Sequence, residues 1–164
     1  MSDITYNIGI VEDNKMLGEL LAWRLQKNPE YNVKLFYSGE DLLQKYNYNP
    51  DLMIVDYHLN GENPYAMNGL QLARRLDNVP IIVFSEQKEL STAVDFIHHG
   101  ACDYVIKDEN ATDNVEKSIK KVINHLKQKK KFVMLKWKSK KDLFRMSMVL
   151  LSVMVGVLIS YLIS

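Results

Sequence analysis

The chain of 164 residues has one cysteine, four prolines and seven glycines. The single cysteine, Cys102, excludes an internal disulfide, and a small free thiol of this kind is expected to be buried. No glycine or proline occurs in residues 101–155, so nothing in that stretch forces a helix to end. The first seven residues are polar and no long apolar segment follows them, so no secretory signal peptide is expected.

The chain has almost no net charge, because 21 basic side chains nearly balance 20 acidic ones to give a formal net charge of +1. The balance hides two oppositely charged parts. Residues 1–113 carry 9 basic and 18 acidic side chains, whereas residues 114–164 carry 12 basic and 2 acidic ones. An acidic globular part followed by a strongly basic tail is therefore expected.

Four short apolar runs in the acidic part each stop at a polar residue. Runs of this length between helix-like stretches predict strands of a parallel sheet that is buried on both faces. The runs are Ile8-Gly9-Ile10-Val11, Leu52-Met53-Ile54-Val55, Ile81-Ile82-Val83-Phe84 and Tyr104-Val105-Ile106, and the residues that follow them are Glu12-Asp13, Asp56, Ser85 and Lys107. Open α/β sheets bind ligands at the carboxyl ends of their strands, so these groups are expected to converge on one crevice. Such a set can hold a divalent cation, offer a carboxylate nucleophile and neutralise a phosphoryl group.

The order of the predicted elements is strand then helix, repeated five times. Helices are expected over residues 14–27, 39–46, 69–76 and 90–99, with Ser38 as the N-cap of the second. A fifth helix is expected to begin with Thr112 or Asp113 as its cap. Such βα repeats imply right-handed crossovers, which place helices on both faces of the sheet.

Four motifs in this order resemble the receiver domain of two-component response regulators: VEDNK (11–15), LMIVD (52–56), PIIVFS (80–85) and GACDYVIKD (100–108). The resemblance covers about residues 4–126. It implies the flavodoxin-like receiver fold, a doubly wound, five-stranded parallel α/β sheet. It also implies phosphorylation on Asp56, with Mg²⁺ as cofactor and a sensor histidine kinase or phosphotransfer protein as donor.

The same resemblance assigns roles to the other residues of the expected crevice. Glu12 and Asp13 correspond to the acidic pair that binds Mg²⁺ together with Asp56 and the His58 backbone carbonyl. Lys107 corresponds to the lysine that contacts the phosphoryl oxygens. Ser85 takes the place of the switch hydroxyl and Tyr104 that of the switch aromatic, while His58 and Gln87 occupy positions that tune the lifetime of the phosphoryl group.

Two features depart from the family pattern. The loop between Asp56 and Gly69 is about five residues longer than usual, with Asn60-Gly61 where a proline is common. Asp108 follows Lys107 in place of a proline, and a cis bond before a non-proline residue costs about 3 kcal/mol. A trans bond is therefore expected there.

A transmembrane helix is predicted over residues 143–164. Its residues 143–163, twenty-one in number, would span roughly 31 Å at about 1.5 Å each, close to the thickness of a bilayer core. The basic segment before it, residues 127–142, favours a cytoplasmic side and is expected to be helical. Ser152, Gly156 and Ser160 share one face and allow close approach of a second helix, so a homodimer is an open alternative. The lysines could otherwise lie along an anionic membrane surface; a nucleic-acid contact ranks last.

These patterns predict three parts: a receiver domain (1–126), a basic juxtamembrane segment (127–142) and a C-terminal transmembrane helix (143–164). The expected function is that of a phosphoryl acceptor at the cytoplasmic face of the inner membrane, which signals through an unidentified protein partner. It is not expected to be an enzyme or to bind nucleic acid. Two alternatives stay open: a scaffold that does not depend on phosphorylation, and a phosphatase with an aspartate nucleophile. The phosphatase requires a second aspartate where this chain has His58.

Overall fold

The structure is a computed structural model that describes residues 5–45, 48–59, 61, 65–76, 78–86, 94, 97–98 and 100–163, without the side chains of 153–154 and 156–163. The chain forms two compact units, Met1–Val122 and Ile123–Ser164. The predicted fourth helix, residues 90–99, lies for the most part outside the described residues.

The first unit contains a sheet of five parallel strands in the order β2-β1-β3-β4-β5. The strands are β1 (Tyr6–Val11), β2 (Tyr31–Phe36), β3 (Leu52–Asp56), β4 (Ile81–Ser85) and β5 (Ala101–Ile106). Val11 pairs with Val55, Asp56 with Phe84, and Ser85 with Ile106. The strands therefore end at one common edge, which confirms the predicted parallel sheet.

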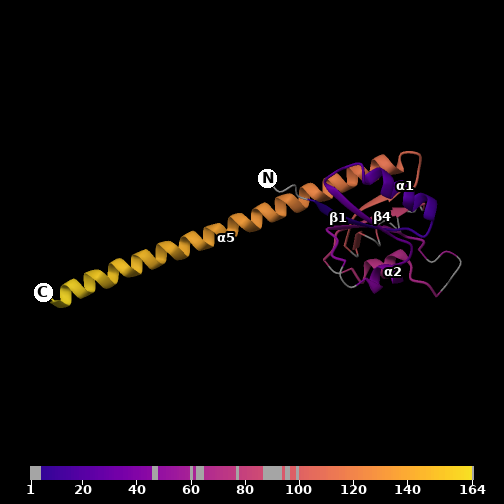
Figure 1. Cartoon of the computed structure of the whole chain (residues 1–164). Coiled ribbons are helices and arrows are strands. Elements are labelled where there is room, and N and C mark those ends of the chain that lie inside the picture. Colours follow the sequence, from indigo (N-terminus) through magenta and orange to yellow (C-terminus); the bar gives the residue numbers. More distant parts are fainter. Residues whose placement is uncertain are drawn as a thin grey trace. The chain divides into compact units, whose positions relative to one another are not determined.

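Helices cover both faces of this sheet (Figure 1). The described helices are α1 (Lys15–Leu25), α2 (Gly39–Gln44), α3 (Gly69–Ala73) and α5 (Ala111–Ile163). The side chain of Arg24 in α1 pairs with Asp113 and Glu116 of α5, each at 3.0 Å, so α1 and the first turns of α5 lie side by side. Leu42 of α2 and Leu72 of α3 belong to one buried cluster with the strands, on the opposite face.

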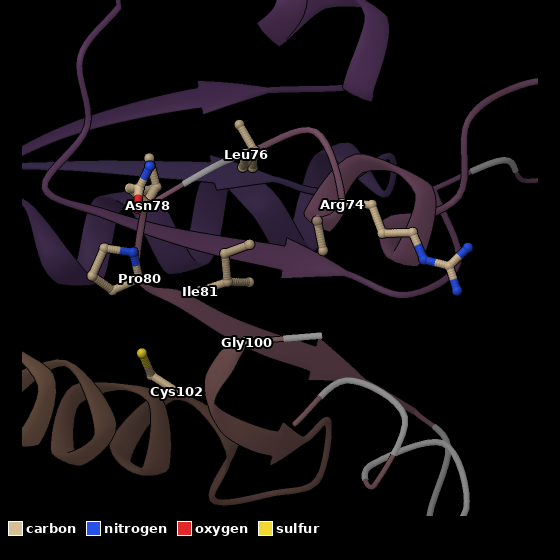
Figure 2. Close-up of a pocket in the computed structure, with 9 residues that line it drawn as sticks. Arg74, Leu76, Asn78, Pro80, Ile81, Gly100 and Cys102 are labelled. Carbon is tan, nitrogen blue, oxygen red and sulfur yellow. The ribbon is translucent and has the colours of Figure 1, made fainter. Parts of the chain in front are cut away.

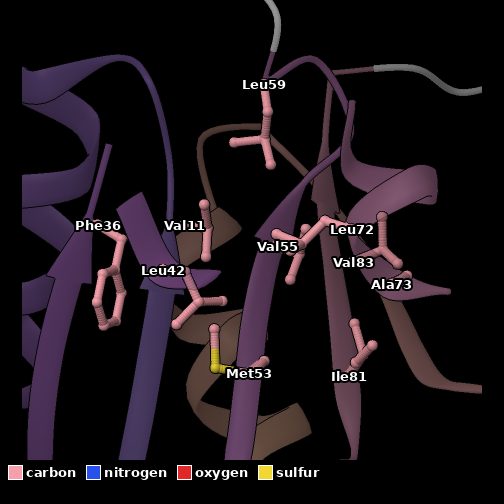
Figure 3. Packing of buried hydrophobic residues seen from close by; sticks show 10 residues of the cluster. All are labelled: Val11, Phe36, Leu42, Met53, Val55, Leu59, Leu72, Ala73, Ile81 and Val83. Atoms are coloured by element: carbon pink, nitrogen blue, oxygen red, sulfur yellow. The ribbon is translucent and has the colours of Figure 1, made fainter. Parts of the chain in front are cut away.

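That cluster is the part of the hydrophobic core that lies on the face of α2 and α3 (Figure 3). Its members are Val11, Phe36, Leu42, Met53, Val55, Leu59, Leu72, Ala73, Ile81 and Val83. Alternate strand residues point to the other face, where Ile10, Ile54 and Ile82 are equally buried. Burial on both faces explains why the central strands are continuous apolar runs rather than alternating ones.

Several local predictions can be compared with the structure. Ser38 caps α2 as expected, since its hydroxyl oxygen accepts a hydrogen bond from the Asp41 amide at 3.0 Å. The expected cap of the fifth helix was wrong, because α5 begins at Ala111, ahead of Thr112. Cys102 is exposed rather than buried, because it lies on β5 at the edge of the sheet. No cis peptide bond occurs among the described residues, in agreement with the trans bond expected after Lys107.

The predicted transmembrane helix over residues 143–164 is not supported. Residues 127–142 and the predicted span up to Ile163 belong to α5, and no helix in the described part of the chain combines the length and apolarity that a membrane crossing needs. Asp142 and Arg145 place charge at the start of the predicted span. Of the proposed packing stripe, Gly156 and Ser160 lie outside the described side chains, and the Ser152 hydroxyl donates to the Val149 carbonyl of its own helix at 2.7 Å.

Gly69 lies where the start of α3 meets the end of β3. Its amide donates to the Tyr57 carbonyl at 2.9 Å, and a Cβ at this position would overlap the carbonyl oxygen of Asp56. Backbone cannot move aside as a flexible side chain can, so we expect Gly69→Ala to lower the free energy of unfolding by about 1–3 kcal/mol. Urea denaturation measures the loss.

Gly39→Ala is the matched control, because Gly39 also opens a helix. A Cβ there would meet the sulfur of Met67 at 3.1 Å, and a methionine side chain can shift. An equal loss of stability in both variants would contradict the explanation.

Candidate functional site

Three carboxylates meet at the edge where the strands end. Glu12 and Asp13 follow β1, and Asp56 is the last residue of β3. One carboxylate oxygen from each residue lies within 4.8 Å of the other two. Glu12 is 1% exposed and Asp56 3%, so two of the three charges are held away from water. The parallel register of β1 and β3 produces this cluster from residues far apart in the sequence.

The ammonium group of Lys107 contacts two of these carboxylates. Its Nζ lies 2.8 Å from Oδ2 of Asp56 and 2.9 Å from Oε2 of Glu12, and it donates a hydrogen bond to Oε1 of Glu12 at 3.0 Å. The Lys107 amide donates to the Ser85 carbonyl at 2.8 Å, which ties the residue to the end of β4. The backbone therefore fixes where this side chain enters the cluster.

The electrostatics of the cluster favour positive charge. Burial raises the pKa of Glu12 to about 7, and the neighbouring charge of Asp56 adds to the rise, while the hydrogen bond and the charge of Lys107 oppose it. Burial alone would lower the pKa of Lys107, but hydrogen bonds to Asp56 and Glu12 outweigh it and raise that pKa. One ammonium thus remains charged among three carboxylates that it cannot fully neutralise.

This donor set fits a divalent cation such as Mg²⁺. Oε2 of Glu12 is buried and accepts no hydrogen bond, although it lies 2.9 Å from the Lys107 ammonium. That one ammonium is shared with Asp56, so the carboxylates keep negative charge that a further cation would offset. Mg²⁺ prefers oxygen ligands and carboxylates, which are the groups that Glu12, Asp13 and Asp56 supply.

The carboxylates open onto a cavity of about 190 Å³ lined by Glu12, Asp13, Asn14, Asp56, His58, Glu86 and Lys107. A larger hollow of about 480 Å³ lies where α3 ends and where β4 and β5 begin (Figure 2). Among the residues that the structure describes, its lining is largely apolar side chains, with Arg74, Asn78 and Cys102 as the polar or reactive ones and no carboxylate. Of these two cavities, the smaller one therefore has the carboxylates and the ammonium group that could bind a metal ion or act in a reaction.

The structure brings Glu12, Asp13, Asp56, His58 and Lys107 into this cavity, as the sequence predicts. The backbone amide of His58 also donates to Oδ1 of Asp56 at 3.2 Å, so it orients the carboxylate.

Two further predicted residues, Ser85 and Tyr104, lie outside the cavity lining. Ser85 is fully buried at the end of β4, next to Glu86, which does line the cavity. Tyr104 is half-buried and packs against the hydrophobic cluster of Figure 3. Gln87 lies outside the described residues.

Two residues at the site were not predicted as part of it. Asn14 lines the cavity and caps α1, where its Oδ1 accepts from the Leu17 amide at 3.2 Å. Its place directly after the acidic pair is a signal that could have identified it. A Cβ on Gly61 would lie 3.4 Å from Oδ2 of Asp13, so the long loop returns to the carboxylates. No sequence pattern reveals that approach, because it depends on the path of the loop.

Comparisons with known proteins agree with this geometry. The family model for the response regulator receiver domain matches residues 8–135. The chain is 32% identical over 107 residues to the phosphate regulon transcriptional regulatory protein PhoB of Rhizobium meliloti, which covers 61% of this chain and 44% of that protein. It is 31% identical over 75 residues to the two-component response regulator ORR27 of Oryza sativa subsp. japonica, which covers 43% of this chain and 11% of the other. The chain thus spans less than half the length of either relative.

Solved receiver domains share the fold. The receiver domain of the Francisella response regulator 1452 superposes with a TM-score of 0.65 at 17% identity, covering 74% of this chain and 99% of that one. The BeF3-activated DrrB receiver domain gives a TM-score of 0.62 at 22% identity, covering 73% of this chain and 98% of that one. At these identities the likeness establishes the fold alone.

Proposed function

This chain belongs to the response regulator receiver domain family, and from that premise we propose that Asp56 is the carboxylate that accepts the phosphoryl group. Receiver domains of two-component signalling are phosphorylated on an aspartate. The observation that supports this residue is the contact of Lys107 Nζ with Asp56 Oδ2 at 2.8 Å, at the end of a buried strand and inside the acidic cavity. Glu12, Asp13 and Glu86 are the other carboxylates there, and each lies beyond the last residue of its strand, whereas Asp56 is itself part of β3.

In the proposed transfer, a carboxylate oxygen of Asp56 attacks the phosphorus of a phosphohistidine. The P–O bond to Asp56 forms while the P–N bond breaks, and the electron pair of that bond stays on the imidazole of the donor. Lys107 faces the carboxylate and can neutralise charge on the incoming oxygens. The His58 amide holds Oδ1 in place during the attack.

Glu12, Asp13 and Asp56, with the backbone carbonyl of His58, would hold Mg²⁺. When bound, the ion supplies positive charge that reduces repulsion between the carboxylates and the phosphoryl oxygens. The raised pKa of Glu12 and the grouping of three carboxylates around one ammonium both support a cation at this place.

The donor is proposed to be a sensor histidine kinase or a phosphotransfer protein, the proteins with which receiver domains interact. α1 offers a docking surface beside the cavity, since Asn14, its N-cap, lines that cavity. Met16, Leu20 and Trp23 lie on one face of α1 at helical spacing, and each is more than half exposed. An exposed apolar stripe beside a site suits a protein partner.

We expect Leu20→Lys to slow phosphotransfer from a phosphorylated histidine protein that labels the wild-type chain by about 10-fold or more, because central apolar contacts dominate binding. Labelling by acetyl phosphate should stay at the wild-type rate, since a small molecule needs no docking surface. Radiolabel transfer from each donor measures the two rates. Equal slowing with both donors would indicate a damaged site rather than a lost docking surface.

After phosphorylation, Ser85 and Tyr104 are proposed to change position and alter the surface that a protein partner recognises. Ser85 joins the site through its carbonyl bond to Lys107, and Tyr104 lies two residues before Ile106, which pairs with Ser85. Phosphorylation would shift the population between two arrangements that both exist. The chain is proposed to act as a signalling acceptor and not as an enzyme that turns over substrate. Its location at the inner membrane stays a prediction.

Acetyl phosphate and Mg²⁺ are expected to add one phosphoryl group to the full chain. Mass spectrometry of proteolytic fragments should place it on the peptide that contains Asp56, and hydroxylamine should remove it because the bond is an acyl phosphate. EDTA should prevent the labelling. A phosphoryl group that resists hydroxylamine, or one found on another peptide, would contradict the proposal.

A further inference from the structure

The second unit has a basic surface that the proposed phosphoryl transfer does not use. Residues 123–164 carry nine Lys or Arg side chains and one acidic side chain, Asp142. Every side chain from Lys127 to Ser152 is exposed. These positions belong to a single helix, so the charges are presented at regular helical spacing.

Apolar side chains are exposed on the same helix. Phe132, Val133, Met134, Leu135 and Trp137 are each more than half exposed. Lys136 Nζ lies 4.7 Å from the centre of the Phe132 ring, and Lys141 Nζ lies 5.3 Å from that of Trp137. Cationic and aromatic side chains thus lie next to one another on the same sides of the helix.

The apolar surface continues beyond the basic segment. After Arg145, the helix exposes Met146, Met148, Val149, Leu150, Leu151 and Val155, and Asp142 and Arg145 are the last charged residues of the chain. A partner that covers this helix must offer negative charge along one part and an apolar environment along the next.

We propose that residues 127–155 bind the surface of an anionic lipid bilayer. Acidic headgroups attract the lysines, and the aromatic and aliphatic side chains enter the boundary between headgroups and acyl chains. Lysine stems can lie along apolar surface while their ammonium groups remain at the headgroups. A nucleic acid would match the charges and leave the apolar residues uncovered. A second copy of the chain would cover the apolar residues and place two lysine-rich segments against each other.

The test is co-sedimentation of the full chain with vesicles. Vesicles of equal parts phosphatidylglycerol and phosphatidylcholine should bind the chain at least about 10-fold more tightly than vesicles of phosphatidylcholine alone, and added salt should reduce the difference. In a Trp23→Phe background, the emission of Trp137 should shift to shorter wavelength on addition of the anionic vesicles. Equal binding to both kinds of vesicle would overturn the proposal.

Charge variants make the test specific to this helix. Replacing Lys129, Lys130 and Lys131 together by Gln should weaken binding to the anionic vesicles by about 100-fold, since each lysine near such a surface contributes roughly a factor of five. The matched control replaces Lys27, Lys34 and Lys45, which are in the first unit, and should change binding little. Equal losses in the two triple variants would overturn the proposal, as would tighter binding to duplex DNA than to the vesicles. Neither readout depends on phosphorylation, so the proposed function and this inference can fail separately.

Discussion

Asp56→Asn is expected to abolish phosphoryl uptake from acetyl phosphate, to below about one hundredth of the wild-type level, because an amide is no nucleophile for phosphorus. The substitution keeps the size of the side chain, and an amide oxygen can still accept from the His58 amide that now contacts Asp56. Removing the buried negative charge of Asp56, which lies beside Glu12, relieves repulsion. The variant should therefore fold. Phosphate-affinity gel electrophoresis measures the uptake, and urea denaturation verifies the fold.

Asp41→Asn is the matched control, because it makes the same chemical change at a half-exposed carboxylate away from the cavity, whose ion pair among the described residues is with Lys45, one turn away at 3.0 Å. Its uptake should equal that of the wild-type chain. Labelling that persists in folded Asp56→Asn would assign the acceptor to another residue. If neither the wild-type chain nor the control is labelled, the chain is a scaffold that does not depend on phosphorylation.

The sheet and the composition of the site could be predicted because they depend on local patterns. A run such as Leu52-Met53-Ile54-Val55 identifies a strand buried on both faces, and in a parallel sheet the residue after it must lie at the common edge. The same rule places Glu12 and Lys107 there. The positions of these residues in the sequence were enough to predict that they meet, because the carboxyl ends of all strands in a parallel sheet lie at the same edge.

Other features depend on tertiary context that no local pattern reveals. The exposure of Cys102 follows from the position of β5 at the edge of the sheet. The approach of Gly61 to Asp13 depends on the path of a long loop. The start of α5 at Ala111 comes from a turn in which the Ala111 amide donates to the Asp108 carbonyl at 3.0 Å, a contact that competes with the cap expected at Thr112.

The shifted pKa of Glu12 makes the stability of the ion-free chain depend on pH. A Glu in the unfolded chain releases its proton near the ordinary pKa of 4.5, whereas Glu12 in the fold keeps it until about pH 7. Between these values the folded chain binds more protons than the unfolded chain, so stability falls as pH rises through this window. The full shift of the Glu12 pKa contributes at most about 3 kcal/mol to the free energy of unfolding, and this contribution is lost once the pH exceeds 7. The main cause of the shift is burial, and the charge of Asp56 is the second.

Glu12→Gln removes the group that titrates. In the presence of EDTA, the free energy of unfolding of this variant relative to wild type should rise by about 1–3 kcal/mol between pH 5 and pH 8, measured by urea denaturation. Lys107 keeps its ion pair with Asp56 in the variant, so the loss of one partner does not leave the ammonium alone. Glu86→Gln is the control, because Glu86 is an exposed carboxyl on the same cavity, and this variant should follow the wild-type pH dependence.

Mg²⁺ at pH 8 should stabilise the wild-type chain more than Glu12→Gln, because only the wild-type chain can offer the buried Oε2 in its charged form. A stability difference between the two chains that stays constant from pH 5 to pH 8 would show that Glu12 is ionised throughout, and would remove the electrostatic reason for placing a cation beside it.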